Sequence, residues 1–164
     1  MSTGRLLLIA AAFAALLVAA GCGGGSSGPT EATVQTGSLS KAEFIKKADA
    51  ICEAARAEFL TKFESFYQAH KAEASNQQSE AAFLGEVFQS VLSPNVERQI
   101  EQISKLGAPK DYAPQAATFL NALQAQLQEF DEDPAKLTAT PYAFKHAENV
   151  AKAAGLIGCS ESFS

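Results

Sequence analysis

A long run of apolar residues spaced three and four apart constrains the fold of this chain more than any other feature. The run follows Ser40 and comprises Phe44, Ala48, Ile51, Cys52, Ala55, Phe59, Phe63, Phe66 and Tyr67. At about 100° per residue these side chains share one half of a helix, as in an amphipathic helix packed on a core. Ser40 and Glu43 form a Ser-x-x-Glu capping box, which predicts that the helix begins there. We expect it to end near Ala74.

Four further segments show the same periodicity, and no segment shows sustained alternation with a period of two, so we predict an all-α fold. The expected helices span about 80–92, 94–106 and 111–130, and a last one opens at Thr140-Pro141. Gly107 and Gly155 are expected to end the third and the last helix, because glycine tolerates the left-handed conformation of a helix end. Short connections then predict a four- or five-helix up-down bundle.

The dipeptide Ser93-Pro94 separates the second and third of these helices. Proline removes a backbone donor and clashes with the preceding turn. A single helix drawn through Pro94 would also displace the apolar stripe by more than a third of a turn. We therefore expect a break or sharp kink, with Ser93 as N-cap and Pro94 at the first helical position.

The first 21 residues differ from the rest, because Arg5 is their one charged residue and residues 6–20 form an uncharged run. That run is shorter than the roughly 20 apolar residues of a membrane span, and it is typical of an export signal. It leads into Leu17-Val18-Ala19-Ala20-Gly21-Cys22, which resembles the lipobox of bacterial lipoproteins. The resemblance implies a diacylglyceryl group on Cys22, cleavage just before it, and a location on the extracytoplasmic face of the cell membrane. A plain secretory signal and an uncleaved anchor are the alternatives.

We therefore divide the chain into three parts. Residues 1–21 are expected to be the lipoprotein signal peptide. Residues 22–38 contain the acylated cysteine followed by a tract rich in glycine and serine, and such a composition predicts a disordered, flexible tether. Residues 39–164 are expected to form the helical bundle domain.

Two cysteines, Cys52 and Cys159, remain once Cys22 is assigned to the lipid. Export places them in an oxidising compartment, where an even number of cysteines implies pairing. We therefore predict a Cys52–Cys159 disulfide, and two separate buried thiols are the alternative.

Four segments of the folded part resemble, in the same order, a group of small exported helical lipoproteins of high-GC bacteria. They are residues 39–52, which end in Ala-Ile-Cys, residues 94–100, the pair Ala108-Pro109, and Gly155-Leu156-Ile157-Gly158-Cys159. The resemblance implies export, lipid attachment in many members, and a disulfide between Cys52 and Cys159. It implies no activity.

A formal net charge of −5 argues against a nucleic-acid binder. Patterns such as G-x-S-x-G occur in the glycine-serine tract, where they arise from composition and lack the strand and helix that their chemistry needs. We predict no catalytic residue, no metal site and no cofactor. The leading hypothesis is a lipid-anchored, non-enzymatic extracytoplasmic module that contacts an envelope protein or a cell-wall component.

The aromatic residues suggest an alternative function. Core packing explains them most simply, but helical bundles also hold ligands between their helices. The alternative is therefore a carrier of a small apolar ligand or a haem in an aromatic-lined core. The candidate lining residues are Phe59, Phe63, Phe66, Tyr67, Phe119 and Phe144.

Overall fold

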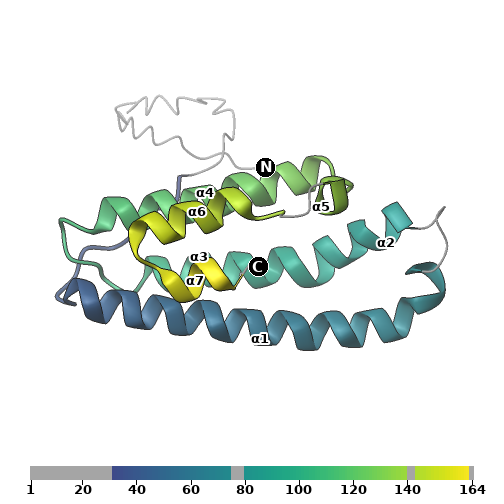
Figure 1. Cartoon of the computed structure of the whole chain (residues 1–164), viewed down its shortest axis with the longest axis horizontal. Helices are drawn as coiled ribbons and strands as arrows, with labels where there is room; N and C mark the ends of the chain where they lie inside the picture. Colours follow the sequence, from purple (N-terminus) through teal and green to yellow (C-terminus); the bar gives the residue numbers. More distant parts are fainter. Residues whose placement is uncertain (1–30, 75–79, 140–142, 163–164) are drawn as a thin grey trace, which may run out of the picture.

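The structure is a computed structural model that describes residues 31–74, 80–139 and 143–162. Within these residues the regular elements are helices. In chain order they are α1 (Lys41–Ala74), α2 (Glu80–Val87), the π-helical turn η1 (Phe88–Leu92), α3 (Ser93–Ser104), α4 (Ala113–Glu132), α5 (Lys136–Ala139), α6 (Lys145–Ala154) and α7 (Ile157–Glu161). α1 runs along one side of the molecule, α2 and α3 run back along it, and α4 lies opposite with α6 beside it (Figure 1). The predicted all-α bundle is confirmed.

The predicted capping box opens α1. The Ser40 N–H donates to Glu43 Oε2 at 2.9 Å, and the Glu43 N–H donates to Ser40 Oγ at 3.3 Å. The hydrogen bonds from Ser40 also lower the pKa of the Glu43 carboxyl group. α1 then continues for 34 residues, with non-helical backbone angles at His70 near its end. None of the described helices combines the length and the apolar composition that crossing a membrane requires.

The core lies where α1, α3, α4 and α6 face one another. Its fully buried apolar side chains include Phe44, Ala48, Cys52, Ile103, Ala116, Phe119, Leu120, Leu123, Ala147, Ala151 and Leu156. Tyr112, just before α4, donates its O–H to the Ala154 carbonyl at the end of α6, at 2.7 Å. Burial, together with the nearby Asp49 carboxylate, raises the pKa of Tyr112 to about 12. This hydrogen bond joins two helix ends inside the core.

The break expected at Ser93-Pro94 is not present, and Leu92 rather than Ser93 is the N-cap of α3, but Pro94 stands at the start of that helix as expected. Leu92 and Ser93 both keep right-handed helical backbone angles, so the chain passes from η1 into α3 within one helix. The Ser93 N–H donates to the Phe88 carbonyl five residues back, which is a π-helical hydrogen bond. The wider turn holds one extra residue and so re-phases the helix by about 100°. Phe88 of η1 and Val96 of α3 thereby meet the same core without an intervening loop.

The predicted disulfide is confirmed, and it joins α1 to the short helix α7. Cys52 and Cys159 are bonded, with their Cα atoms 4.9 Å apart. The Cys159 N–H donates to Asp49 Oδ1 at 3.1 Å, one turn earlier on α1. The predicted stop glycines are confirmed as well, because Gly107 and Gly155 have φ angles of +78° and +81°.

The end of the chain differs from the single last helix that the sequence suggested. Thr140 and Pro141, the expected opening, lie outside the described residues, and α6 begins only at Lys145 without a side-chain cap. Two short helices, α5 and α7, were not predicted. The left-handed turn at Gly155 redirects the chain, and the next residue, Leu156, is fully buried. α7 can then return Cys159 to α1.

Residues 31–38, the N-terminal strap, pack on the bundle, so the prediction of a flexible tether is wrong for these residues. Val34 is 8% exposed and belongs to the core. The Ala32 N–H donates to Asn121 Oδ1 on α4 at 2.6 Å. The Gly37 N–H donates to the Ala108 carbonyl, and the Ala108 N–H donates to the backbone carbonyl of Gln35, each at 2.8 Å. These backbone bonds and one buried valine outweigh the polar composition of the segment. The rest of the expected tether and the signal peptide lie outside the described residues.

Candidate functional site

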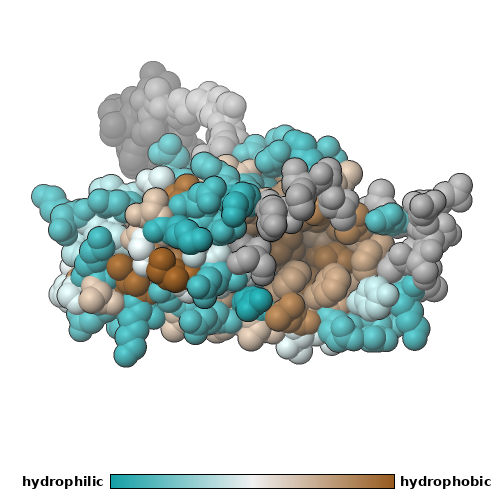
Figure 2. Space-filling view, viewed as in Figure 1, coloured by the Kyte–Doolittle hydropathy of each residue, from teal (hydrophilic) through white to brown (hydrophobic). Residues whose placement is uncertain are grey.

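A cavity of about 290 Å³ lies between α1 and α3, and its walls are completed by α5, the two residues before α6, and Ser162 after α7. Its apolar lining residues are Cys52, Ala55, Phe59, Leu60, Leu92, Val96, Leu137, Ala143 and Phe144. Its polar lining residues are Arg56, Asn95, Gln99 and Ser162. The mouth opens at the surface as a hollow with a largely apolar floor above α1 (Figure 2). The cavity is therefore largely apolar, with few charged groups in its lining.

Small residues line the cavity from two segments of the chain, Ala55 on α1 and Ala143 before α6. Cys52, Ala55 and Phe59 are spaced three and four apart on α1, so they share one helix face. Ala55 stands between two larger side chains and leaves space that a leucine or phenylalanine would fill. Ala143 is the small residue of the second segment, next to Phe144.

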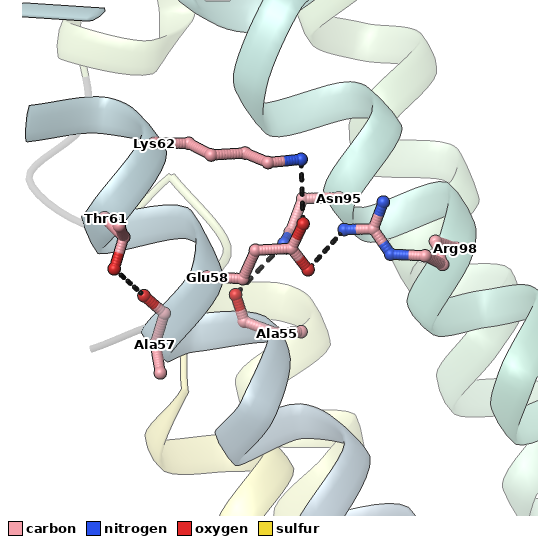
Figure 3. A network of polar contacts seen from close by, with 7 residues as sticks. All are labelled: Ala55, Ala57, Glu58, Thr61, Lys62, Asn95 and Arg98. Atoms are coloured by element: carbon pink, nitrogen blue, oxygen red, sulfur yellow. Dashed lines mark hydrogen bonds and ion pairs between the residues drawn. The ribbon is translucent and has the colours of Figure 1, made fainter. Parts of the chain in front are cut away.

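A polar network beside the cavity holds α1 against α3 (Figure 3). Glu58 accepts hydrogen bonds from Lys62 at 2.7 Å and from Arg98 on α3 at 2.6 Å. Its hydrogen bond with Lys62, and then the charge of Arg98, lower the pKa of the Glu58 carboxyl group. Asn95 Nδ2 donates to the Ala55 carbonyl at 3.0 Å, and Asn95 is 5% exposed. These contacts fix the spacing of the two helices that form the cavity.

Gln99 differs from Asn95, which is also buried in the cavity lining but makes a hydrogen bond. It is 2% exposed, and neither Nε2 nor Oε1 of its carboxamide has a hydrogen-bond partner within the described part of the chain. Gln126, the other buried glutamine of the core, is fully paired. Its Nε2 donates to the Ala143 carbonyl at 2.6 Å, and its Oε1 accepts from the Ala147 N–H at 2.9 Å. Buried polar groups without partners are rare in folded proteins.

The structure brings two of the six predicted aromatic residues into the cavity, Phe59 and Phe144. Phe119, on α4, is fully buried in the core of the bundle and does not line the cavity. Phe63 and Tyr67 continue from Phe59 along α1, with ring centroids 5.8 Å and then 6.3 Å apart. The aromatic residues therefore divide between the cavity, the core and a row along α1.

Phe66, the remaining candidate, lines a second and more open pocket of about 440 Å³. His70 lines the same pocket and stacks on Phe66, with ring centroids 4.2 Å apart. His70 Nδ1 also lies 2.9 Å from the Phe66 carbonyl oxygen. Both contacts are with Phe66, so His70 has a packing role near the end of α1.

The sequence analysis missed the polar residues of the cavity, Gln99 above all. A signal was available, because Gln99 is three residues after Val96 and four before Ile103, both on the apolar face of α3. A glutamine at such a position must be buried and so requires partners. The periodicity shows the burial, but it does not show whether the partners exist.

Within the residues that the structure describes, no group of three or more His, Cys, Asp or Glu side chains is placed to hold a metal ion. No known protein family, curated protein or solved structure gives a significant match to this chain.

Proposed function

We propose that this protein is a non-enzymatic module, held on the extracytoplasmic face of the cell membrane by a lipid on Cys22, that binds a small apolar molecule between α1 and α3. The cavity with its apolar walls is the observation that supports ligand binding. The export signal and the lipobox resemblance at residues 17–22 support the anchor. The Cys52–Cys159 disulfide agrees with export, because disulfides persist in oxidising compartments.

The size of the cavity sets the size of the ligand. Protein interiors contain few voids larger than a water molecule. An engineered apolar cavity of about 150 Å³ binds benzene. A cavity of about 290 Å³ then has room for one or two rings, or about a dozen non-hydrogen atoms. A haem is several times larger, so the residues present do not fit the haem that the sequence left open.

Contact with an envelope protein or a cell-wall component is the second candidate function. The observation that favours it is an exposed apolar row on α1. Leu60 and Tyr67 are 53% and 40% exposed, and they lie seven residues apart on the same helix face. Leu60 also lines the mouth of the cavity, so a partner bound to this row would cover the ligand.

Filling the cavity tests ligand binding. We expect naphthalene to bind the full chain saturably and to shift the amide NMR signals of the cavity residues on α1 and α3. Ala55→Phe should weaken this binding at least about tenfold, because its ring occupies the space of the ligand. Ala54→Phe is the matched control, since Ala54 is exposed on the same helix. Equal binding by the two variants would contradict the proposal.

The anchor is tested separately in cells. Wild-type protein should incorporate radiolabelled fatty acid and sediment with membranes. Cys22→Ala should lose the label and shift the protein into the soluble fraction, since two acyl chains on one residue provide stable attachment. Ser26→Ala, four residues later, should behave as wild type. Membrane association that survives Cys22→Ala would remove the lipid from the proposal.

A further inference from the structure

The unpartnered carboxamide of Gln99 adds a chemical requirement to the ligand. Resting on the proposed function, we infer that the cavity takes an uncharged ring compound with a hydrogen-bond donor and an acceptor side by side, as in a cyclic amide. Gln99 lines the cavity, is 2% exposed, and has no hydrogen-bond partner among the described residues at either end of its carboxamide. Both polar atoms are themselves buried, so a ligand pairs with them only once the Gln99 side chain turns into the cavity.

The chemistry of glutamine specifies the complementary group. Its carboxamide presents an NH₂ donor and a carbonyl acceptor in one plane. A lone donor or a lone acceptor on the ligand would pair one end and leave the other end unpaired, at the cost of a buried polar group. A neighbouring N–H and C=O pairs both ends at once. Glutamine uses the same bidentate geometry to recognise the edge of adenine.

The surroundings of Gln99 favour a neutral ligand. Three buried residues of the same lining carry no charge, namely the disulfide-bonded Cys52, Val96 and Phe144. Arg56 is the one ionisable lining residue among those described, and it is exposed to solvent. A charge placed beside Gln99 would be removed from water without an opposite charge at that depth, which is strongly unfavourable.

Three fused-ring probes of similar shape separate these possibilities. 2-Quinolinone carries the adjacent N–H and C=O, naphthalene carries no polar group, and 2-naphthoate carries a carboxylate. Each is titrated into the full chain in detergent micelles, with amide NMR signals of cavity residues as the readout. Each probe partitions equally into the micelles whichever variant is present. The change in preference between two variants is therefore independent of the detergent.

Gln99→Met keeps the length of the side chain and removes its polar atoms. Wild type should prefer 2-quinolinone over naphthalene, and Gln99→Met should reduce this preference about tenfold, since two hydrogen bonds are lost. Gln102→Met is the matched control, because Gln102 is exposed on the same helix. It should keep the wild-type preference.

Three results would overturn the inference, and they differ in what they leave standing. An equal preference in wild type and Gln99→Met rejects the role of Gln99, while saturable naphthalene binding keeps the proposed function. Tightest binding of 2-naphthoate, lost in Arg56→Gln, also keeps the function but assigns an anionic ligand. Failure of all three probes to shift the cavity signals rejects the proposed function as well.

Discussion

Two buried glutamines in one core show how much a single position decides. Gln126 on α4 has both ends of its carboxamide paired with backbone groups of residues 143 and 147. Gln99 on α3 is more deeply buried and has no partner within the described residues. The first glutamine holds the segment before α6 against α4. The second stores a cost that a ligand can relieve.

That cost is measurable without any ligand. In the ligand-free protein, Gln99→Met should raise the free energy of unfolding by about 1–3 kcal/mol, because it replaces an unpaired buried amide with an apolar group of similar shape. Urea unfolding followed by circular dichroism checks this. Gln102→Met, at an exposed position, should change stability by less than about 0.5 kcal/mol. A loss of stability in Gln99→Met would show that the amide is satisfied in the folded state.

Tyr112 makes the stability of the fold depend on pH at alkaline values. Burial and the charge of Asp49 raise its pKa in the folded state to about 12, against an ordinary value of 10. The folded state therefore keeps the proton that the unfolded state releases. The resulting stability is fully present below pH 10 and is lost as the pH rises from 10 towards 12.

The measurement compares wild type with Tyr112→Phe. Absorbance of tyrosinate should reveal one late ionisation near pH 12 in wild type, and this step should be absent from the variant. Urea unfolding at a series of pH values should show a steeper loss of stability above pH 10 in wild type. The variant should also be less stable at neutral pH, because the Ala154 carbonyl loses its donor. Parallel pH profiles would rule out this role for Tyr112.

At the scale of elements, the close approach of α7 to α1 depends on Gly158, the residue before Cys159. A Cβ atom built on Gly158 would lie 2.8 Å from Asp49 Cβ and 3.0 Å from Asp49 Cγ. α7 can therefore approach α1 only with glycine at this position. The same close approach lets Asp49 accept a hydrogen bond from the N–H of Cys159, beside the disulfide.

Gly158→Ala should destabilise the protein by about 1–3 kcal/mol, because α7 must move away from α1. Gly85→Ala is the matched control. Gly85 lies inside α2, and beyond the backbone of its own helix a Cβ atom there would meet no described atom within 4 Å. Alanine at this position should therefore stabilise the helix by about 0.5–1 kcal/mol. Thermal unfolding by circular dichroism measures both variants, and shifts of the same sign would contradict the packing argument.

The π-helical turn η1 acts at the same scale. It lets α2 and α3 pass through Pro94 as one helix, with Phe88 and Val91 buried on the core side. A loop at this point would have separated the two helices and released Leu92, which lines the cavity. The turn therefore places the residues of α3 in register with those of α1.

For the whole molecule, the disulfide is the long-range covalent constraint. It links residues 107 positions apart and fastens the end of the chain to α1. Closing a loop of this length reduces the entropy of the unfolded chain, with a limit of about 4.7 kcal/mol in the chain-entropy model. The N-terminal strap adds further long-range contacts by packing on α4 and on the turn around Ala108.

Replacing Cys52 and Cys159 together by alanine should lower the free energy of unfolding by about 2–5 kcal/mol. Reducing wild type with dithiothreitol should produce the same loss and add the mass of two hydrogen atoms. The double variant should not respond to reductant, which is the internal control. A wild-type unfolding curve that reductant leaves unchanged would show that the bridge adds no stability.

The sequence predicted well the features that depend on neighbours along the chain. The capping box of Ser40, the apolar face of α1, and the stop glycines 107 and 155 are local, because a helix end needs only the residues of its own turn. The disulfide could be predicted because the expected lipid on Cys22 and the expected export to an oxidising compartment leave one pairing of the remaining cysteines. The short helices α5 and α7 carry too few turns for a periodic signal.

The sequence by itself therefore determined an all-α bundle, its main helices and its covalent closure. Only the tertiary structure decided that the strap packs on α4, that a π-helical turn carries the chain through Pro94, and that a cavity remains beside Gln99. A void is the difference between the space enclosed by several helices and the volume of side chains from all of them. No single helix encodes that difference, because each wall of the cavity is distant in sequence from the wall it faces.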